Sequence, residues 1–69
     1  MTDMSLVLNG GKIRVNEGVT IAELLRDLGF GDARVAVARN RDCVRRAEWA
    51  TTTLEADDQI EILAPMAGG

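Results

Sequence analysis

The residues best placed to take part in a reaction are the last two, Gly68 and Gly69, which follow Pro65, Met66 and Ala67. Neither glycine can add a side chain to a core, and glycine weakens a strand. A tail without side chains can instead be threaded through a narrow channel, where its terminal carboxylate approaches a phosphate or a nucleophile without obstruction. Such a carboxylate can be activated as an acyl-adenylate and passed to sulfur or nitrogen. We therefore predict that Gly69 is the acceptor and that Gly68 permits threading; a frayed terminus is the alternative.

The sequence offers little other side-chain chemistry. It has no histidine and one cysteine, Cys43, so it lacks the commonest general base, the usual zinc ligands and any internal disulfide. Arginines at 41, 45 and 46 would activate the Cys43 thiol if they converged on it, but an inert, partly buried thiol is the expected state. A chain of 69 residues is also too short for a cleft with a full catalytic apparatus. We predict no metal site and no bound cofactor.

The charge balance excludes two broad classes of protein. With 8 basic and 11 acidic residues, a net charge of −3 and 46% hydrophobic residues, the chain is too apolar to be disordered and not basic enough for general nucleic-acid binding. Residues 34–46 nevertheless contain five arginines and one aspartate. This basic segment, which includes Arg39 and Arg46, is either a docking patch for an acidic partner or a solvated hairpin. The scarcity of aromatic residues disfavours RNA binding through base stacking.

The sequence carries no signal for secretion or membrane insertion. Its first four residues lack the charged and long apolar regions of a secretion signal, and no apolar run approaches the length needed to cross a bilayer. We therefore predict a cytoplasmic protein without a membrane partner.

The first third of the chain predicts a β-hairpin followed by a short helix. Apolar residues recur in 5–9 and 12–16, and Gly10 and Gly11 between them supply a tight turn. Thr20 and Glu23 have the spacing of a capping box, so a helix is predicted to begin at residue 21 and to end at the glycine at 29. Because isolated helices of about two turns are unstable, this helix must pack on the sheet.

The remaining residues are predicted to complete one sheet. They are expected to form strands at 35–38, 43–44 and 60–63, turns at 40–42 and 57–58, and a loop with at most one helical turn at 46–49. We place 35–38 at the centre of the sheet. The predicted architecture is α+β, with a mixed sheet of four to five strands and one main helix packed on one face. Residues 1–64 form this domain and 65–69 a flexible tail. The predicted core consists of Leu6, Leu8, Ile13, Val15, Ile21, Leu24, Leu25, Leu28, Val35, Val37, Leu54, Ile60 and Ile62. Trp49 is expected to be a core or sheet-covering residue, with an interface anchor as the alternative.

Four segments together resemble the sulfur-carrier family of thiazole synthesis in the thiamin pathway. They are Thr20-Ile21-Ala22-Glu23-Leu24-Leu25, Val35-Ala36-Val37-Ala38-Arg39-Asn40, Arg46-Ala47-Glu48-Trp49 and Gly68-Gly69. The resemblance covers nearly the whole chain and implies a ubiquitin-like β-grasp fold. The Gly-Gly ending is shared by several ubiquitin-like groups, whereas the second and third segments favour the thiazole branch.

The same resemblance implies a function and partners. An E1-like enzyme would adenylate the Gly69 carboxylate with ATP, and a sulfur donor, such as a cysteine desulfurase, would convert it to a thiocarboxylate. Thiazole synthase would then consume that sulfur. The protein is thus expected to be a cosubstrate of partner enzymes and not an enzyme itself. Two alternatives remain open: the small subunit of molybdopterin synthase, and a ubiquitin-like modifier whose Gly69 is joined to lysines of other proteins.

Overall fold

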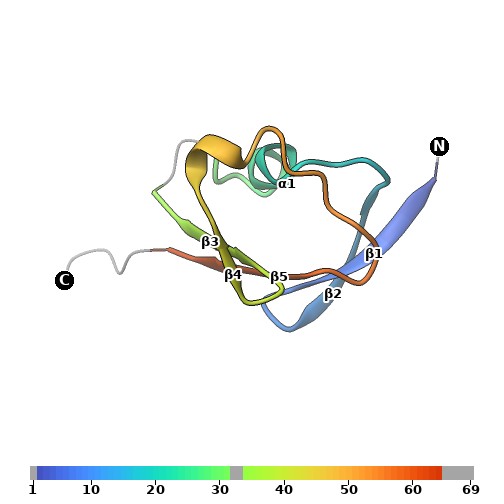
Figure 1. Ribbon diagram of the computed structural model, residues 1–69. Coiled ribbons are helices and arrows are strands. Elements are labelled where there is room, and N and C mark those ends of the chain that lie inside the picture. The colour runs from blue at the N-terminus through green and yellow to red at the C-terminus, as the bar shows by residue number, and fades with distance from the viewer. Residues whose placement is uncertain (1, 32–33, 65–69) are drawn as a thin grey trace.

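The computed structural model describes residues 2–31 and 34–64. These residues form five strands, one α-helix and one 3-10 helix (Figure 1). In chain order the elements are β1 (Asp3–Leu8), β2 (Gly11–Asn16), α1 (Ile21–Asp27), β3 (Ala36–Arg39), β4 (Asp42–Val44), the 3-10 helix η1 (Arg46–Glu48) and β5 (Gln59–Leu63).

The strands form one mixed sheet in the order β2-β1-β5-β3-β4. Strand β5 runs parallel to β1 and antiparallel to β3, and the two outer pairs are antiparallel hairpins. Helix α1 and the 3-10 helix lie on the same side of the sheet (Figure 1). The predicted α+β architecture is therefore confirmed. The placement of residues 35–38 at the centre was wrong, because the last strand inserts between β1 and β3 and takes the central position.

The β1–β2 turn is displaced by one residue from its predicted place. Its two central residues are Asn9, with φ of 49°, and Gly10, with φ of 85°. Gly11 already belongs to β2 and pairs with Leu8. An asparagine followed by glycine suits a two-residue hairpin turn, because both positions need positive φ. The Asn9 side chain consequently lies at the end of the sheet toward which β5 runs.

The capping box predicted for α1 is confirmed. The Thr20 hydroxyl accepts a hydrogen bond from the Glu23 backbone N–H at 3.2 Å, and the Glu23 carboxylate accepts one from the Thr20 backbone N–H at 2.9 Å. Beyond the helix, Gly29 has φ of 90°, as its predicted capping role requires. The backbone N–H of Ile21 donates to the Thr52 carbonyl, which ties the start of the helix to the loop before β5.

The core lies between α1 and the inner face of the sheet. Its buried apolar residues are Leu6, Val19, Ile21, Leu24, Leu25, Val37, Trp49, Leu54, Ile60 and Ile62. Trp49 is buried as predicted, and its Nε1 donates to the Val44 carbonyl at 3.0 Å. Val19 is a core residue that the prediction missed. Leu28 is 40% exposed, contrary to prediction; it is the C-cap of α1 and follows the last helical residue.

Three further residues of the predicted core, Leu8, Ile13 and Val15, are half-buried and pack against its edge, as does Val35. No helix in the two described stretches is long and apolar enough to cross a membrane.

Candidate functional site

The predicted site residues, Gly68 and Gly69, lie outside the described residues, so their roles stay predictions. The same holds for the division of the chain into residues 1–64 and a tail at 65–69. Toward the predicted site, the described chain ends at Ala64, one residue after β5. The part of the site that the structure does describe is therefore the base of the tail: the end of β5 and the side chains around it.

The end of β5 is held on both sides. On one side β3 pairs with it up to its last residue, Leu63, which lies opposite Ala36. On the other side β1 ends at Leu8, which pairs with Ile60, so β1 does not reach the last residues of β5.

The Asn9 side chain continues the pairing where β1 stops. Its Oδ1 accepts a hydrogen bond from the Ile62 backbone N–H at 2.8 Å, and its Nδ2 donates to the Ile62 carbonyl at 3.4 Å. The amide thus takes the place of a peptide group in the missing part of β1. Because aspartate has no N–H to donate to the Ile62 carbonyl, the amide of Asn9 is what allows both contacts, and Asn9 anchors the strand that leads to the tail.

The start of β5 is fixed by a second polar cluster centred on Asp58, which is only 6% exposed. Its carboxylate accepts hydrogen bonds from Arg39 Nε at 2.8 Å, from Asn40 Nδ2 at 3.1 Å and from the Glu55 backbone N–H at 2.8 Å. Asn40 also pairs with the Gln59 backbone through its own N–H and its Oδ1. The cluster joins the β3–β4 hairpin to β5.

The ionised form of Asp58 is favoured in this cluster. Burial alone would raise the pKa of the carboxyl, but the Glu55 N–H, the Asn40 amide and the Arg39 guanidinium together hold the pKa below its usual range. Asp58 is therefore a charged structural link between strands. It lies at the start of β5, whereas the tail follows the end of that strand.

The arginines of the basic segment do not form one docking patch. Arg39 is engaged by Asp58, and Arg41 lies in the β3–β4 turn, near the start of β5. Arg46 stacks over the Trp49 ring, with its guanidinium carbon 5.3 Å from the ring centroid. Of the predicted patch, Arg34 and Arg46 lie at the base of the tail.

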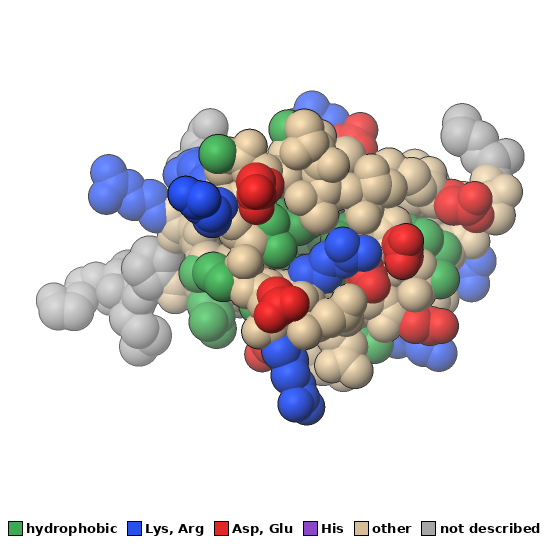
Figure 2. All heavy atoms as spheres, in the orientation of Figure 1, with side chains coloured by type: hydrophobic (Ala, Val, Ile, Leu, Met, Phe, Trp, Pro, Cys, Tyr) green, Lys and Arg blue, Asp and Glu red, His purple; other side chains and the backbone are tan. Residues whose placement is uncertain are grey.

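An open hollow of ≈ 630 Å³ adjoins the base of the tail. It is lined by Arg34, Val35, Ala36, Arg46, Leu63 and Ala64. Leu63 is 65% exposed, although an apolar side chain of that size is usually covered. Figure 2 shows hydrophobic and basic side chains side by side at the end of the molecule where β3 begins and β5 ends. Such a mixture fits a partner surface that is apolar with an acidic rim.

Cys43 is exposed and free, so the expectation of a partly buried thiol was wrong. The register explains the difference. Val37 pairs with Val44 and faces the core, so the next pair, Ala38 and Cys43, faces the outer side of the sheet. In the described stretches no group of three cysteine, aspartate or glutamate side chains is placed to hold a metal ion.

Comparison with known proteins identifies the family. A sequence model of the ThiS family matches residues 6–69. The chain belongs to the ThiS family. It is 33% identical over 66 residues to the sulfur carrier protein ThiS of Escherichia coli, an alignment that covers 96% of this chain and 100% of that protein. The resemblance to the sulfur-carrier family of thiazole synthesis is thereby confirmed.

Two longer proteins are also similar to this ThiS family member. The thiazole synthases of Magnetococcus marinus and Paramagnetospirillum magneticum are 39% and 35% identical to it over 66 residues. The chain spans about a fifth of the length of each.

Solved structures of the ThiS family share the fold. The crystal structure of the thiamine biosynthesis protein ThiS from Geobacter metallireducens has a TM-score of 0.81 and 33% identity, covering 96% of this chain and 100% of that one. A solution structure of a thiamine biosynthesis protein from the same organism has a TM-score of 0.80 and 32% identity. The predicted β-grasp fold is thus confirmed.

Proposed function

We propose that this protein is a sulfur carrier of thiamin biosynthesis and that its reactive group is the Gly69 carboxylate. The observation that carries the proposal is the match to the ThiS family, which extends through residue 69 and therefore includes the Gly-Gly pair. The full-length similarity to the E. coli sulfur carrier supports the same function.

The chemistry needs no side chain of this protein. A Gly69 carboxylate oxygen attacks the α-phosphorus of ATP on an E1-like partner, and pyrophosphate leaves. The outer sulfur of a persulfide on a donor, such as a cysteine desulfurase, then attacks the acyl carbon, and AMP departs with one former carboxylate oxygen. A thiol reductant attacks the donor's own sulfur in the resulting acyl disulfide and forms a new disulfide with it, so the transferred sulfur stays on Gly69. The product is a thiocarboxylate. The protein acts in these steps as a cosubstrate, and ATP is used by the partner without being a cofactor of the carrier.

The base of the tail supports this role mechanically. Asn9 holds Ile62 on one side of β5, and β3 pairs with β5 through Leu63 on the other side. Both of the last two residues of β5 are therefore held in register. A tail that leaves such a strand starts from a fixed point and in a fixed direction, which reduces the entropy lost when it enters a partner's channel. The exposed Leu63 and the neighbouring Arg34 offer that partner a surface to dock against.

Thiazole synthase is the proposed acceptor of the sulfur. Two proteins named thiazole synthase contain a stretch similar to this chain over 96% of its length, which supports a working association between the two activities. The E1-like enzyme and the sulfur donor rest on the family resemblance alone. The cytoplasmic location stays a prediction.

A reconstituted reaction tests the proposal. The protein, an E1-like activating enzyme, ATP, a sulfur donor and a thiol reductant are combined, and intact-mass spectrometry follows the exchange of oxygen for sulfur. We expect the exchange in the unaltered chain and in Cys43→Ser, and none when Gly69 is deleted. Circular dichroism confirms that each variant is folded. Sulfur acquired at an unchanged rate without Gly69, or lost in folded Cys43→Ser, would contradict the proposal.

A further inference from the structure

Among the described residues, strand β2 lies at an edge of the sheet, and the backbone N–H and C=O groups of alternate residues point away from its partner β1. The backbone N–H of Val7 donates to the Asp58 carbonyl, and that of Asn9, just after β1, donates to the Ile60 carbonyl, both at 2.9 Å. The backbone N–H and C=O groups of the odd-numbered residues of β1 therefore point toward β5. The backbone groups of its even-numbered residues point toward β2. Because antiparallel partners alternate between bonded and non-bonded pairs, the backbone groups of Lys12 and Arg14 in β2 point away from β1. This edge can accept another strand.

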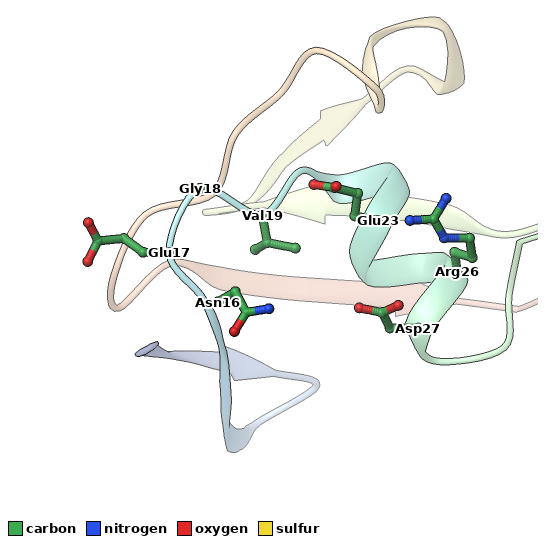
Figure 3. Close-up of a pocket in the computed structure, with 7 residues that line it drawn as sticks. All are labelled: Asn16, Glu17, Gly18, Val19, Glu23, Arg26 and Asp27. Carbon is green, nitrogen blue, oxygen red and sulfur yellow. The ribbon is translucent and has the colours of Figure 1, made fainter. Parts of the chain in front are cut away.

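A groove runs beside the same edge, between β2 and α1. It consists of two adjoining hollows of ≈ 300 Å³ and ≈ 310 Å³ that share Asn16, Val19 and Asp27. The apolar side chains lining the first hollow are Ile13, Val15, Val19, Leu24 and Leu28. Figure 3 shows the second hollow, where the side chains of Asn16 and Asp27 point toward one another from β2 and α1, and Val19 lies above them in this view.

The position of this groove gives an added strand a defined side-chain pattern. Residues opposite Ile13 and Val15 would point into the groove, because those two side chains face α1, and would need to be apolar. Residues opposite Lys12 and Arg14 would lie on the outer face, beside two exposed basic side chains. Opposite charges directly across a strand pair stabilise it, whereas like charges destabilise it.

The charges therefore decide between two occupants of the edge. A second copy of this chain, pairing β2 with β2, would set Lys12 and Arg14 against the same basic residues of the other copy. Basic side chains on an edge strand are a common means of preventing such self-association. An acidic strand meets no such repulsion. The second hollow, at the other end of the groove, is mostly acidic. It is lined by one basic residue, Arg26, and by the acidic residues Glu17, Glu23 and Asp27, so it favours a positively charged side chain of the bound strand.

We propose that the β2–α1 groove binds an extended segment of another protein, which adds to β2 as a further strand of the sheet. The segment has apolar side chains alternating with acidic ones, and a lysine or arginine at the end that lies over Asp27. Backbone hydrogen bonds to Lys12 and Arg14 supply part of the affinity, and the apolar side chains and charges supply the selectivity. This site is separate from the base of the tail, which is formed by β3, β5 and η1. A bound segment would thus leave Gly69 free to react.

A short peptide tests the proposal on the whole chain. The probe is an acetylated, amidated heptapeptide of sequence Lys-Thr-Val-Glu-Ile-Glu-Val, in which Lys shares the groove face with the apolar residues. It is titrated into isotope-labelled protein and followed by amide chemical shifts. We expect saturable shifts in β2 and along the facing side of α1, with the other edge strand, β4, unaffected. The matched control peptide is N-methylated at both glutamates, which removes the strand N–H groups without changing the side chains, and we expect it not to bind.

Two variants of the protein sharpen the test. Reversing the charge in Arg14→Glu should weaken peptide binding by about threefold to tenfold, because a favourable cross-strand pair becomes a repulsive one. Arg41→Glu makes the same change in the other hairpin and should leave binding unchanged.

Several results would overturn the proposal. They are shifts centred on β4, equal binding of the N-methylated peptide, unchanged affinity in folded Arg14→Glu, or no saturation at millimolar peptide. Sedimentation that revealed a dimer formed through β2 would assign the edge to a second copy instead. None of these outcomes bears on the sulfur-transfer reaction, which is measured separately.

Discussion

Replacing Asp58 by asparagine should remove a charge on which the attachment of β5 depends. The carboxylate is 6% exposed and accepts three hydrogen bonds, one of them at 2.8 Å from Arg39. An asparagine of nearly equal volume has one acceptor oxygen, and its NH₂ group must face one of the three donors. The variant therefore breaks the ion pair and leaves at least one donor without its acceptor.

The expected loss of stability follows from the surroundings of the pair. Removing one partner of a fully buried ion pair costs about 3–5 kcal/mol. The Arg39 side chain is 27% exposed, so water can solvate part of its charge in the variant, and we expect a smaller loss of about 2–3 kcal/mol. A domain of this size is stable by roughly 3–10 kcal/mol, so the variant should fold but melt at a clearly lower temperature.

Urea denaturation at several pH values is the assay. Because the folded-state pKa of Asp58 lies below its unfolded-state value, the charge stabilises the fold at neutral pH, and this contribution is lost as the pH falls through the lowered pKa. Asp58→Asn should therefore lose less free energy of unfolding on acidification than the unaltered protein. A double-mutant cycle with Arg39→Met should return a favourable coupling between the two side chains. A loss below about 0.5 kcal/mol at neutral pH, a size typical of surface substitutions, would refute the reasoning, as would identical acid dependence in both proteins.

Three other substitutions have defined outcomes. Thr20→Ala should cost about 0.5–2 kcal/mol of stability in thermal melts while the folded variant is still adenylated, and loss of adenylation would instead indicate a contact role. Asn9→Gly keeps the positive φ of the turn but removes the side-chain amide that bonds to Ile62. Hydrogen exchange at the Ile62 amide should therefore accelerate, and sulfur transfer should slow. Unchanged hydrogen exchange would show that Asn9 does not anchor β5. Arg34→Glu should slow association with the activating enzyme at low salt, whereas Arg41→Glu, at the other end of β3, should not; equal effects of the two would disprove local docking.

Local sequence signals predicted the elements of the fold well. The capping box at Thr20 and the glycine after the helix depend on residues within a few positions of each other, so the sequence contains all the information needed. The order of the strands depends on contacts between distant segments. Residue 9 is followed 53 positions later by its partner Ile62, and no local pattern reveals that pairing.

The roles of Gly68 and Gly69 stay predictions, and the described part of the site, at the end of β5, was not predicted from the sequence. Leu63 occupies an outward position of β5, and an apolar residue at such a position is a sequence signal for a contact surface. The basic segment was recognised from composition, but composition does not reveal that Arg39 turns toward Asp58 while Arg34 lies near Leu63 and Ala64. The exposure of Cys43 likewise depends on strand register, which a three-residue strand does not specify by itself.

The most direct measurement of the central claim is mass spectrometry of the protein isolated from its native cell. The intact mass establishes whether the mature chain ends at Gly69, and fragmentation locates any added sulfur along the chain. We predict a population that ends at Gly69 and carries one sulfur in place of a terminal carboxylate oxygen, with Cys43 unmodified. A chain that continues beyond Gly69 in its active form, or sulfur found on Cys43 with an ordinary terminal carboxylate, would contradict the carrier mechanism.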